Sequence, residues 1–167
     1  IQWQAREVGD ENTAKAPSFL QEFAKDYKDD DRVKRVITGM AWHRNRFVLL
    51  SGKCICMSAD GDYYNFWPKT AMTVNEIDPI DIEAAVQMPA PLKDAMEVNA
   101  GLVLFAKDEQ FLLTTDAEGF RPGSAKVMSL AKFNYNVDVH PIKIGSNIGF
   151  MSDAGLNDKL FEMSKVS

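Results

Sequence analysis

Between Val36 and Asp81, short apolar runs alternate with turn-forming sequences, and this alternation constrains the fold more than any other feature of the chain. The turns HRNR and SGK separate the runs Val36–Trp42, Phe47–Leu50 and Cys54–Met57. Short runs bounded by turn residues are typical of strands joined as hairpins. The sequence DGD then breaks the pairing, and Pro68 ends the aromatic run that follows. We therefore predict a meander of four successive strands.

The same pattern recurs further along the chain. Two more pairs of apolar runs predict hairpins: Gly101–Phe105 with Gln110–Leu113, and Ile142–Ile144 with Ile148–Met151. Hairpins thus recur roughly every 40 to 55 residues, a spacing expected of propeller blades with insertions. Several runs are apolar at consecutive positions, which favours strands covered on both faces. We expect a mainly β fold with about three propeller-like blades, a partial propeller because closure commonly takes about four to eight. An open array of sheets and an independent β-sandwich remain alternatives.

Residues 1–35 differ from the β-rich remainder, 36–167, and are expected to form a separate extension. Ser18 and Gln21 have the spacing of a capping box. Apolar residues then recur at helical period: Phe19, Leu20, Phe23, Ala24 and Tyr27. These features predict a short amphipathic helix. A second helical turn, or a loop, is expected within Pro89–Ala100.

Composition excludes some classes of function. The chain has 167 residues, 46% of them hydrophobic, and a formal net charge of −5, so it has ordinary globular composition. Proteins that bind nucleic acid tightly do so through clustered Lys and Arg, which this chain lacks. A DNA conduit is still compatible with this charge, because acidic walls do not retain phosphates. The sequence shows no membrane-spanning run and no signal peptide.

Cofactor chemistry has little support in the sequence. Cys54 and Cys56 lie two positions apart in a predicted strand, so they share one face at a separation that is poor for a mutual disulfide. We expect buried thiols. The only histidines, His43 and His140, are too distant in sequence to complete an evident zinc site, and no phosphate-binding glycine loop is present. No cofactor and no metal are therefore expected.

Three sets of polar residues are candidates for a catalytic or binding site. Glu76, Asp78, Asp81 and Glu83 could supply the two carboxylates of a glycosidase, but carboxylates in a polar connection more often form a solvated edge. Asp60 and Asp62 do not follow the helix-loop-helix calcium spacing, so a tight turn is favoured. His43 lies beside two arginines on a predicted turn, where we expect an exposed, hydrogen-bonded ring.

The aromatic run between the DGD turn and Pro68 is the main candidate for a contact surface. Large rings bury much area, so core packing explains some of them. Tyr, Trp and Arg are also enriched in subunit interfaces, which favours a contact with another subunit for the rest. The residues of this candidate interface are Trp42, Arg44, Arg46, Tyr63, Tyr64, Phe66 and Trp67.

The chain carries an ordered set of short motifs, of which the strongest are RNR leading into LLSG at 44–52, Ser58, GDYYNFWP at 61–68 and DPID at 78–81. This set resembles the nozzle family, or tail tubular protein B family, of short-tailed podoviruses. Weaker similarities occur at 9–13, 17–19, 102–114 and 144–155, so the resemblance covers nearly the whole chain. In the family, the first strand follows the PSF motif more closely, so residues 20–35 look like an insertion.

The resemblance implies a propeller-containing fold in a structural protein of the virion, assembled in the host cytoplasm. It also implies a ring of nozzle subunits that extends the tail below an adaptor protein and conducts duplex DNA without binding it tightly. Family members are much longer than this chain, so an excised domain or a fragment is expected. The alternative is a tail-associated polysaccharide hydrolase or a glycan-binding β domain.

Overall fold

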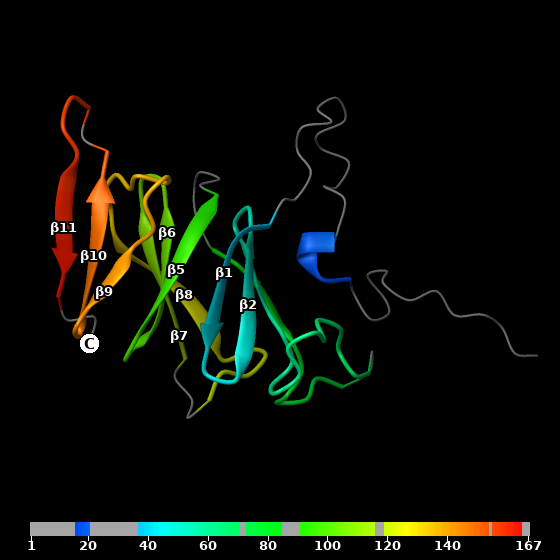
Figure 1. Cartoon of the computed structure of the whole chain (residues 1–167). Coiled ribbons are helices and arrows are strands. Elements are labelled where there is room, and N and C mark those ends of the chain that lie inside the picture. The colour runs from blue at the N-terminus through cyan, green and yellow to red at the C-terminus, as the bar shows by residue number, and fades with distance from the viewer. Residues whose placement is uncertain are drawn as a thin grey trace, which may run out of the picture.

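The computed structural model describes residues 16–20, 37–70, 73–84, 91–115, 119–153 and 155–164, and these form three antiparallel sheets (Figure 1). The first sheet contains β1 (Ile37–His43), β2 (Arg46–Ser51), β3 (Cys54–Met57) and β4 (Ile80–Glu83). The second contains β5 (Leu92–Val98), β6 (Gly101–Ala106), β7 (Gln110–Thr115) and β8 (Ala125–Ala131). The third contains β9 (Ile142–Ile144), β10 (Asn147–Ser152) and β11 (Lys159–Met163). In each sheet, strands that are consecutive in sequence are neighbours.

The first sheet confirms the predicted meander, with a different connection before its last strand. A two-residue turn joins β1 to β2, and Arg44 in that turn takes the left-handed conformation, with φ of 52°. Register pairs Trp42 with Phe47 across the hairpin. The aromatic run after DGD forms turns and irregular chain instead of a strand. The fourth strand begins only at Ile80, directly after Pro79.

The second sheet confirms the β6–β7 hairpin and corrects the segment before it. The helical turn or loop expected within Pro89–Ala100 is wrong, because Leu92–Val98 is strand β5, paired antiparallel with β6. Its Lys, Ala, Met and Glu residues have good helix propensity, but pairing with a fully buried neighbour decides the outcome. The hairpin predicted between Ile142 and Met151 is confirmed as β9 and β10.

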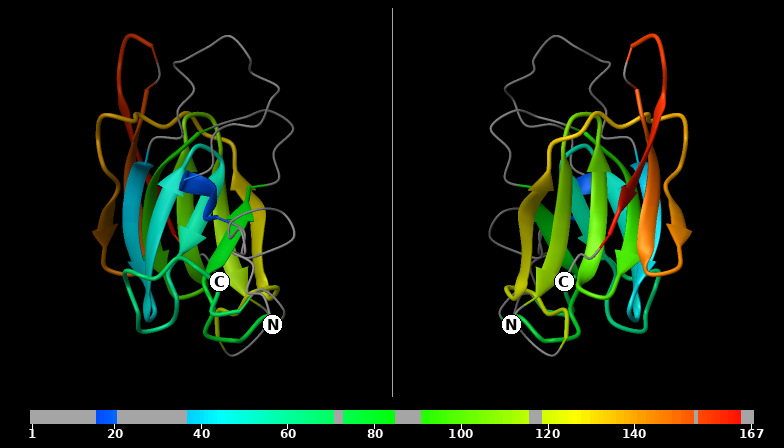
Figure 2. Two further views of the ribbon diagram at one scale, coloured as in Figure 1. Left: turned by 90° about the vertical axis from the view of Figure 1, so that its right-hand side faces the viewer. Right: turned by 90° about the vertical axis from the view of Figure 1, so that its left-hand side faces the viewer.

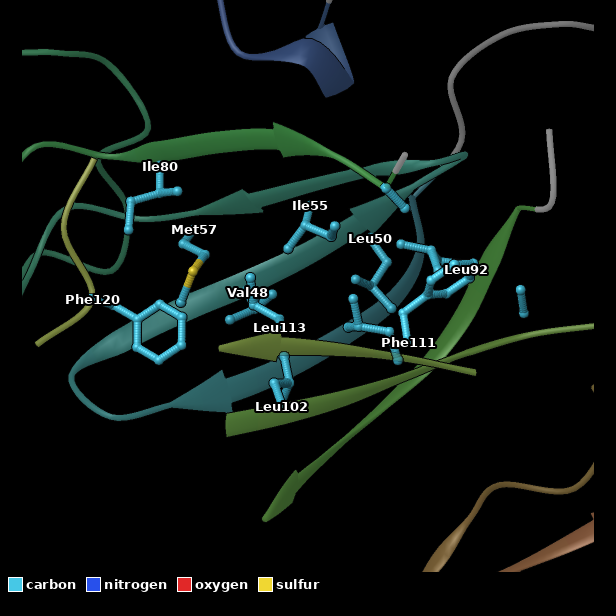
Figure 3. Close-up of a cluster of buried hydrophobic side chains, with 13 residues drawn as sticks. Val48, Leu50, Ile55, Met57, Ile80, Leu92, Leu102, Phe111, Leu113 and Phe120 are labelled. Atoms are coloured by element: carbon cyan, nitrogen blue, oxygen red, sulfur yellow. The ribbon is translucent and has the colours of Figure 1, made fainter. Parts of the chain in front are cut away.

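The three sheets stack face to face, and side chains from facing sheets form two buried clusters between them (Figures 1 and 2). Strand β6 is buried along its whole length because it contributes to both clusters. Leu102, Leu104 and Ala106 point toward the first sheet, where Figure 3 shows the packed side chains. Val103 and Phe105 point toward the third sheet. This arrangement confirms strands covered on both faces.

The observed class is mainly β, with antiparallel sheets and little helix in the described residues. Within those residues the sheets are open and close no ring, so a propeller is not established by the fold. The helix expected after Ser18 is represented by a single 3-10 turn, η1 (Ser18–Leu20), and its remainder lies outside the described residues. The boundary expected near residue 35 also lies outside them.

Candidate functional site: an aromatic surface on the first sheet

Aromatic rings line the outer face of the first sheet, the face turned away from the second sheet. Trp42 contacts Tyr63 edge-on at 4.7 Å between ring centroids, and it lies 4.8 Å from Phe47. Phe47 contacts Phe66 at 6.5 Å, and Phe66 contacts Phe19 of η1 at 5.3 Å. Edge-to-face pairs at these distances are favourable. We call this row, together with Tyr64 and Trp67, which neighbour Tyr63 and Phe66 in sequence, the aromatic surface: Phe19, Trp42, Phe47, Tyr63, Tyr64, Phe66 and Trp67.

Burial divides the aromatic surface into packed and exposed rings. Phe19, Phe47 and Phe66 are partly buried against a small core of Leu49, Cys54 and Cys56. Tyr64 is 96% exposed, Trp42 55% and Trp67 38%. Tyr63 is half-buried, and its hydroxyl donates to Asn45 Oδ1 at 3.0 Å. The exposed rings are therefore available to a partner, while the packed rings fix the shape of the surface.

Phe19 and Phe47 belong to this surface, although neither is among the interface residues expected from the sequence. A signal for Phe47 was present, because a two-residue hairpin pairs it with Trp42 and strand period two places it with Leu49. No local signal identifies Phe19, which reaches the sheet from a distant segment. Its neighbour Ser18 holds that segment in place: the Ser18 backbone N–H and hydroxyl both donate to the Asp81 carboxylate at 2.6 Å.

Arg46 does not belong to an accessible interface, which corrects its inclusion in the candidate set. Only 2% of the residue is exposed. Its guanidinium donates to four backbone carbonyls, those of Ser58, Glu76, Asp78 and Phe120, at 2.7–3.1 Å. Burial lowers the pKa of the guanidinium from its usual value, while Asp60 and Asp78 act in the opposite direction. Arg46 thus joins the loops at one end of the first two sheets.

The structure separates the other charged residues of the β1–β2 turn. Arg44 is exposed, and its guanidinium lies 5.4 Å from the centroid of the Phe120 ring, within reach of a cation–π contact. His43 was expected to be exposed, and this is wrong. It is 2% exposed, and its Nδ1 lies 2.9 Å from Glu97 Oε1. The ring is hydrogen-bonded as expected, but the facing second sheet covers it.

The two cysteines are buried thiols on one face of β3, as predicted, and neither forms a disulfide. Cys56 Sγ lies 3.0 Å from Ser18 Oγ, with Asp81 Oδ1 at 3.6 Å. Burial, reinforced by the Asp81 charge, raises the pKa of the Cys56 thiol to about 12. A thiol with such a pKa is protonated at neutral pH and is a poor nucleophile. Cys56 therefore serves packing.

Comparison of this sequence with known proteins shows the family to which the chain belongs. A protein family described as "Bacteriophage nozzle protein" matches residues 1–167 of this chain. This chain is a member of the bacteriophage nozzle protein family. It is also similar to tail tubular protein gp12 of Escherichia phage T7, with 29% identity over 153 residues. That match covers 91% of this chain and 17% of the length of the T7 protein. The resemblance to the nozzle family is confirmed, and a structural tail component is supported.

Within this nozzle family member, the carboxylates considered for glycosidase chemistry have structural partners. Asp78 was expected on a solvated edge, and this is wrong. The residue is 4% exposed, and its carboxylate accepts from the backbone N–H of Asn75 at 2.8 Å. Glu76 pairs with Arg121 and Glu83 with Lys53, each at 2.7 Å. Family membership supports the structural role over the hydrolase and glycan-binding alternatives.

Metal binding and a membrane-spanning helix have no support in the described residues. No group of three or more His, Cys, Asp or Glu side chains there is placed to hold a metal ion. No helix in the same residues is long and apolar enough to cross a membrane. An open groove of about 400 Å³ near the aromatic surface is lined by residues of η1, by Phe66 and by β4.

Proposed function

We propose that this chain is a structural segment of the wall of a phage tail nozzle, and that it acts by shape and stiffness without catalysis. The family match over the whole chain carries the proposal. The name of the T7 relative supports it, because a tail tubular protein is by name a part of the tail. Three sheets that share buried clusters give a stiff unit suited to a tube wall. The protein would be assembled in the host cytoplasm and act in the virion tail.

The three sheets are proposed to be consecutive blades of a propeller that further sheets of a longer protein complete. The pattern of stacking supports this, because each internal junction is made by apolar faces. The outer face of the third sheet is apolar as well, with Ile142, Ile144 and Leu160 42–66% exposed. Exposed apolar faces of this kind indicate contacts with further protein.

Ring assembly is proposed to use the exposed part of the aromatic surface. Tyr64 and Trp67 lie in the connection between β3 and β4, and Trp42 lies near the β1–β2 turn with Arg44. Exposed Tyr, Trp and Arg side chains suit the centre of a subunit interface. The partners would be neighbouring nozzle subunits in the ring, with the tail adaptor protein above it.

Duplex DNA is proposed to pass the nozzle without tight binding. The formal net charge is −5, and tight binding requires several Lys or Arg side chains that displace counterions from phosphates. A mobility-shift assay at low salt should therefore show weak binding. Tight binding that falls steeply with added salt would replace the passive conduit with a DNA-gripping function.

The proposed placement can be tested by electron cryomicroscopy of rings formed by full-length nozzle subunits that contain this sequence. We expect the three-sheet stack inside the ring wall, with another sheet packed against Ile142, Ile144 and Leu160. A stack that projects from the ring with this face in solvent would contradict the propeller proposal. A stack that lies outside the ring altogether would contradict the wall function.

A further inference from the structure

The first and second sheets meet along β1 and β5, and His43 is the titratable group that β1 contributes to this junction. At the start of β1, the Thr38 hydroxyl donates to the Leu92 carbonyl. Gly39 then approaches β5 so closely that an added Cβ would lie 2.6 Å from the Lys93 carbonyl oxygen. At the end of β1, His43 Nδ1 contacts Glu97 Oε1 at 2.9 Å. The junction thus runs along both strands and ends at an imidazole–carboxylate contact.

The second ring nitrogen of His43, Nε2, has no hydrogen-bond acceptor among the described residues to receive a proton. His43 Nε2 is buried and has no hydrogen-bond partner among the described residues. The ring packs edge-on against Phe120, with 4.7 Å between centroids and an interplanar angle of 87°. A neutral ring with its proton on Nδ1 satisfies the Glu97 contact and leaves Nε2 bare. A proton on Nε2 would be a buried donor without an acceptor, which is costly.

The charges around His43 act on its protonation in opposite directions, and burial outweighs them. Glu97 on β5 is the anion in contact with the ring, and its side chain is 51% exposed. The β1–β2 hairpin supplies two cations near Phe120: Arg44 over the ring and Arg46 on the Phe120 carbonyl. From the Phe120 loop itself, Arg121 is paired with Glu76 at 2.7 Å. An imidazolium here would gain the Glu97 anion, but burial of the ring and the charge of Arg44 oppose it.

We propose that His43 is a proton-sensitive contact between the first two sheets, holding β1 against β5 when neutral and loosening that junction when Nε2 is protonated. Burial lowers the pKa of His43 from 6.5 as the largest effect. The Glu97 hydrogen bond and charge raise this pKa, and Arg44 lowers it further. Because the folded state favours the neutral ring, the contribution of His43 to the free energy of unfolding is complete above pH 6.5. It is lost as pH falls through the folded pKa.

The expected effect can be measured as a change in the unfolding equilibrium with pH. At a pH below both values, each pKa unit by which the folded state lies below the unfolded state raises the equilibrium constant for unfolding about tenfold. Urea unfolding of the whole chain at pH 7.5 and at pH 5.5 should show a several-fold larger unfolded fraction in acid. His43→Asn keeps a donor near the Nδ1 position but does not titrate. The loss of stability between pH 7.5 and pH 5.5, which we call the acid loss, should therefore be several-fold smaller in this variant. His140→Gln removes the other histidine and should retain the acid loss.

Equal acid losses in the wild-type chain and His43→Asn would overturn the proposal. A second arm applies even if His43→Asn does not fold. The NMR signal of the His43 ring should titrate with a midpoint below 6.5, and Glu97→Gln should lower that midpoint because it removes the favourable anion. Hydrogen exchange corrected for intrinsic rates should rise in β1 and β5 over the same pH range. A midpoint at or above 6.5, or unchanged protection in both strands, would also overturn it.

Discussion

At the scale of single residues, Arg46 is the side chain on which most local structure depends. A guanidinium has five N–H donors in a fixed plane, and here it reaches carbonyls from three separate parts of the chain. Those carbonyls belong to the ends of both the first and the second sheet. The burial of this cation is tolerated because each bond is charge-assisted. The loop that carries Tyr64 and Trp67 lies between two of the anchored segments.

We predict that Arg46→Lys lowers the free energy of unfolding by about 2 to 4 kcal/mol. A lysine ammonium can donate only three hydrogen bonds and cannot copy the planar fork, so carbonyls are left buried without a donor. Urea unfolding followed by circular dichroism measures the loss. Arg44→Lys is the matched control, because Arg44 is exposed, and it should change stability by less than about 0.5 kcal/mol. Similar small losses for both variants would show that the carbonyl contacts contribute little.

The sequence could predict residues whose environment is set by their own strand, and it failed where distant segments decide. Cys54 and Cys56 were placed correctly because strand period alone puts them on one buried face. His43 and Arg46 were expected on an exposed turn, since a polar hairpin is normally solvated. Their burial depends on β5 and on the Phe120 loop, which are more than fifty residues away. No local pattern reports such contacts.

At the scale of elements, β6 is the centre of the stack because both of its faces are covered. Its alternate residues supply the two clusters that join the three sheets. A strand in this position has no polar face, so its sequence is apolar at every position from Leu102 to Ala106. Hairpins with such runs were therefore predictable. Strand β5 was not, because its half-buried mixed sequence lacks a clear period of two.

Truncation of either side of β6 should be strongly destabilising. Leu104→Ala removes packing between the first and second sheets, and Phe105→Ala removes packing between the second and third. We expect each variant to lose about 2 to 5 kcal/mol in chemical unfolding. Met128→Ala on β8, which is largely exposed, is the control and should lose far less. A loss below about 0.5 kcal/mol for Phe105→Ala would mean that the third sheet contributes little to the stack.

At the scale of the whole molecule, the described residues form a stack of three sheets. Its internal junctions are apolar, and its outer faces retain large exposed apolar side chains. Each sheet is built from strands that are neighbours in sequence, so the hairpin pattern of the sequence follows the division into sheets. The aromatic surface was found by composition, but which rings are exposed depends on η1 and the loop anchored by Arg46.

The central claim is that this chain is a segment of a nozzle wall with a subunit contact at its exposed rings. Competition during assembly tests it most directly: full-length nozzle subunits form rings while the isolated chain is added in increasing excess, and ring yield is measured by sedimentation. We predict a dose-dependent fall in yield. Tyr64→Ala should weaken that fall several-fold, because Tyr64 is the most exposed ring of the surface and its removal spares the core. Leu156→Ala, also fully exposed but distant in sequence, should compete like the unmodified chain. Unchanged ring yield at large excess of the folded chain would contradict the account.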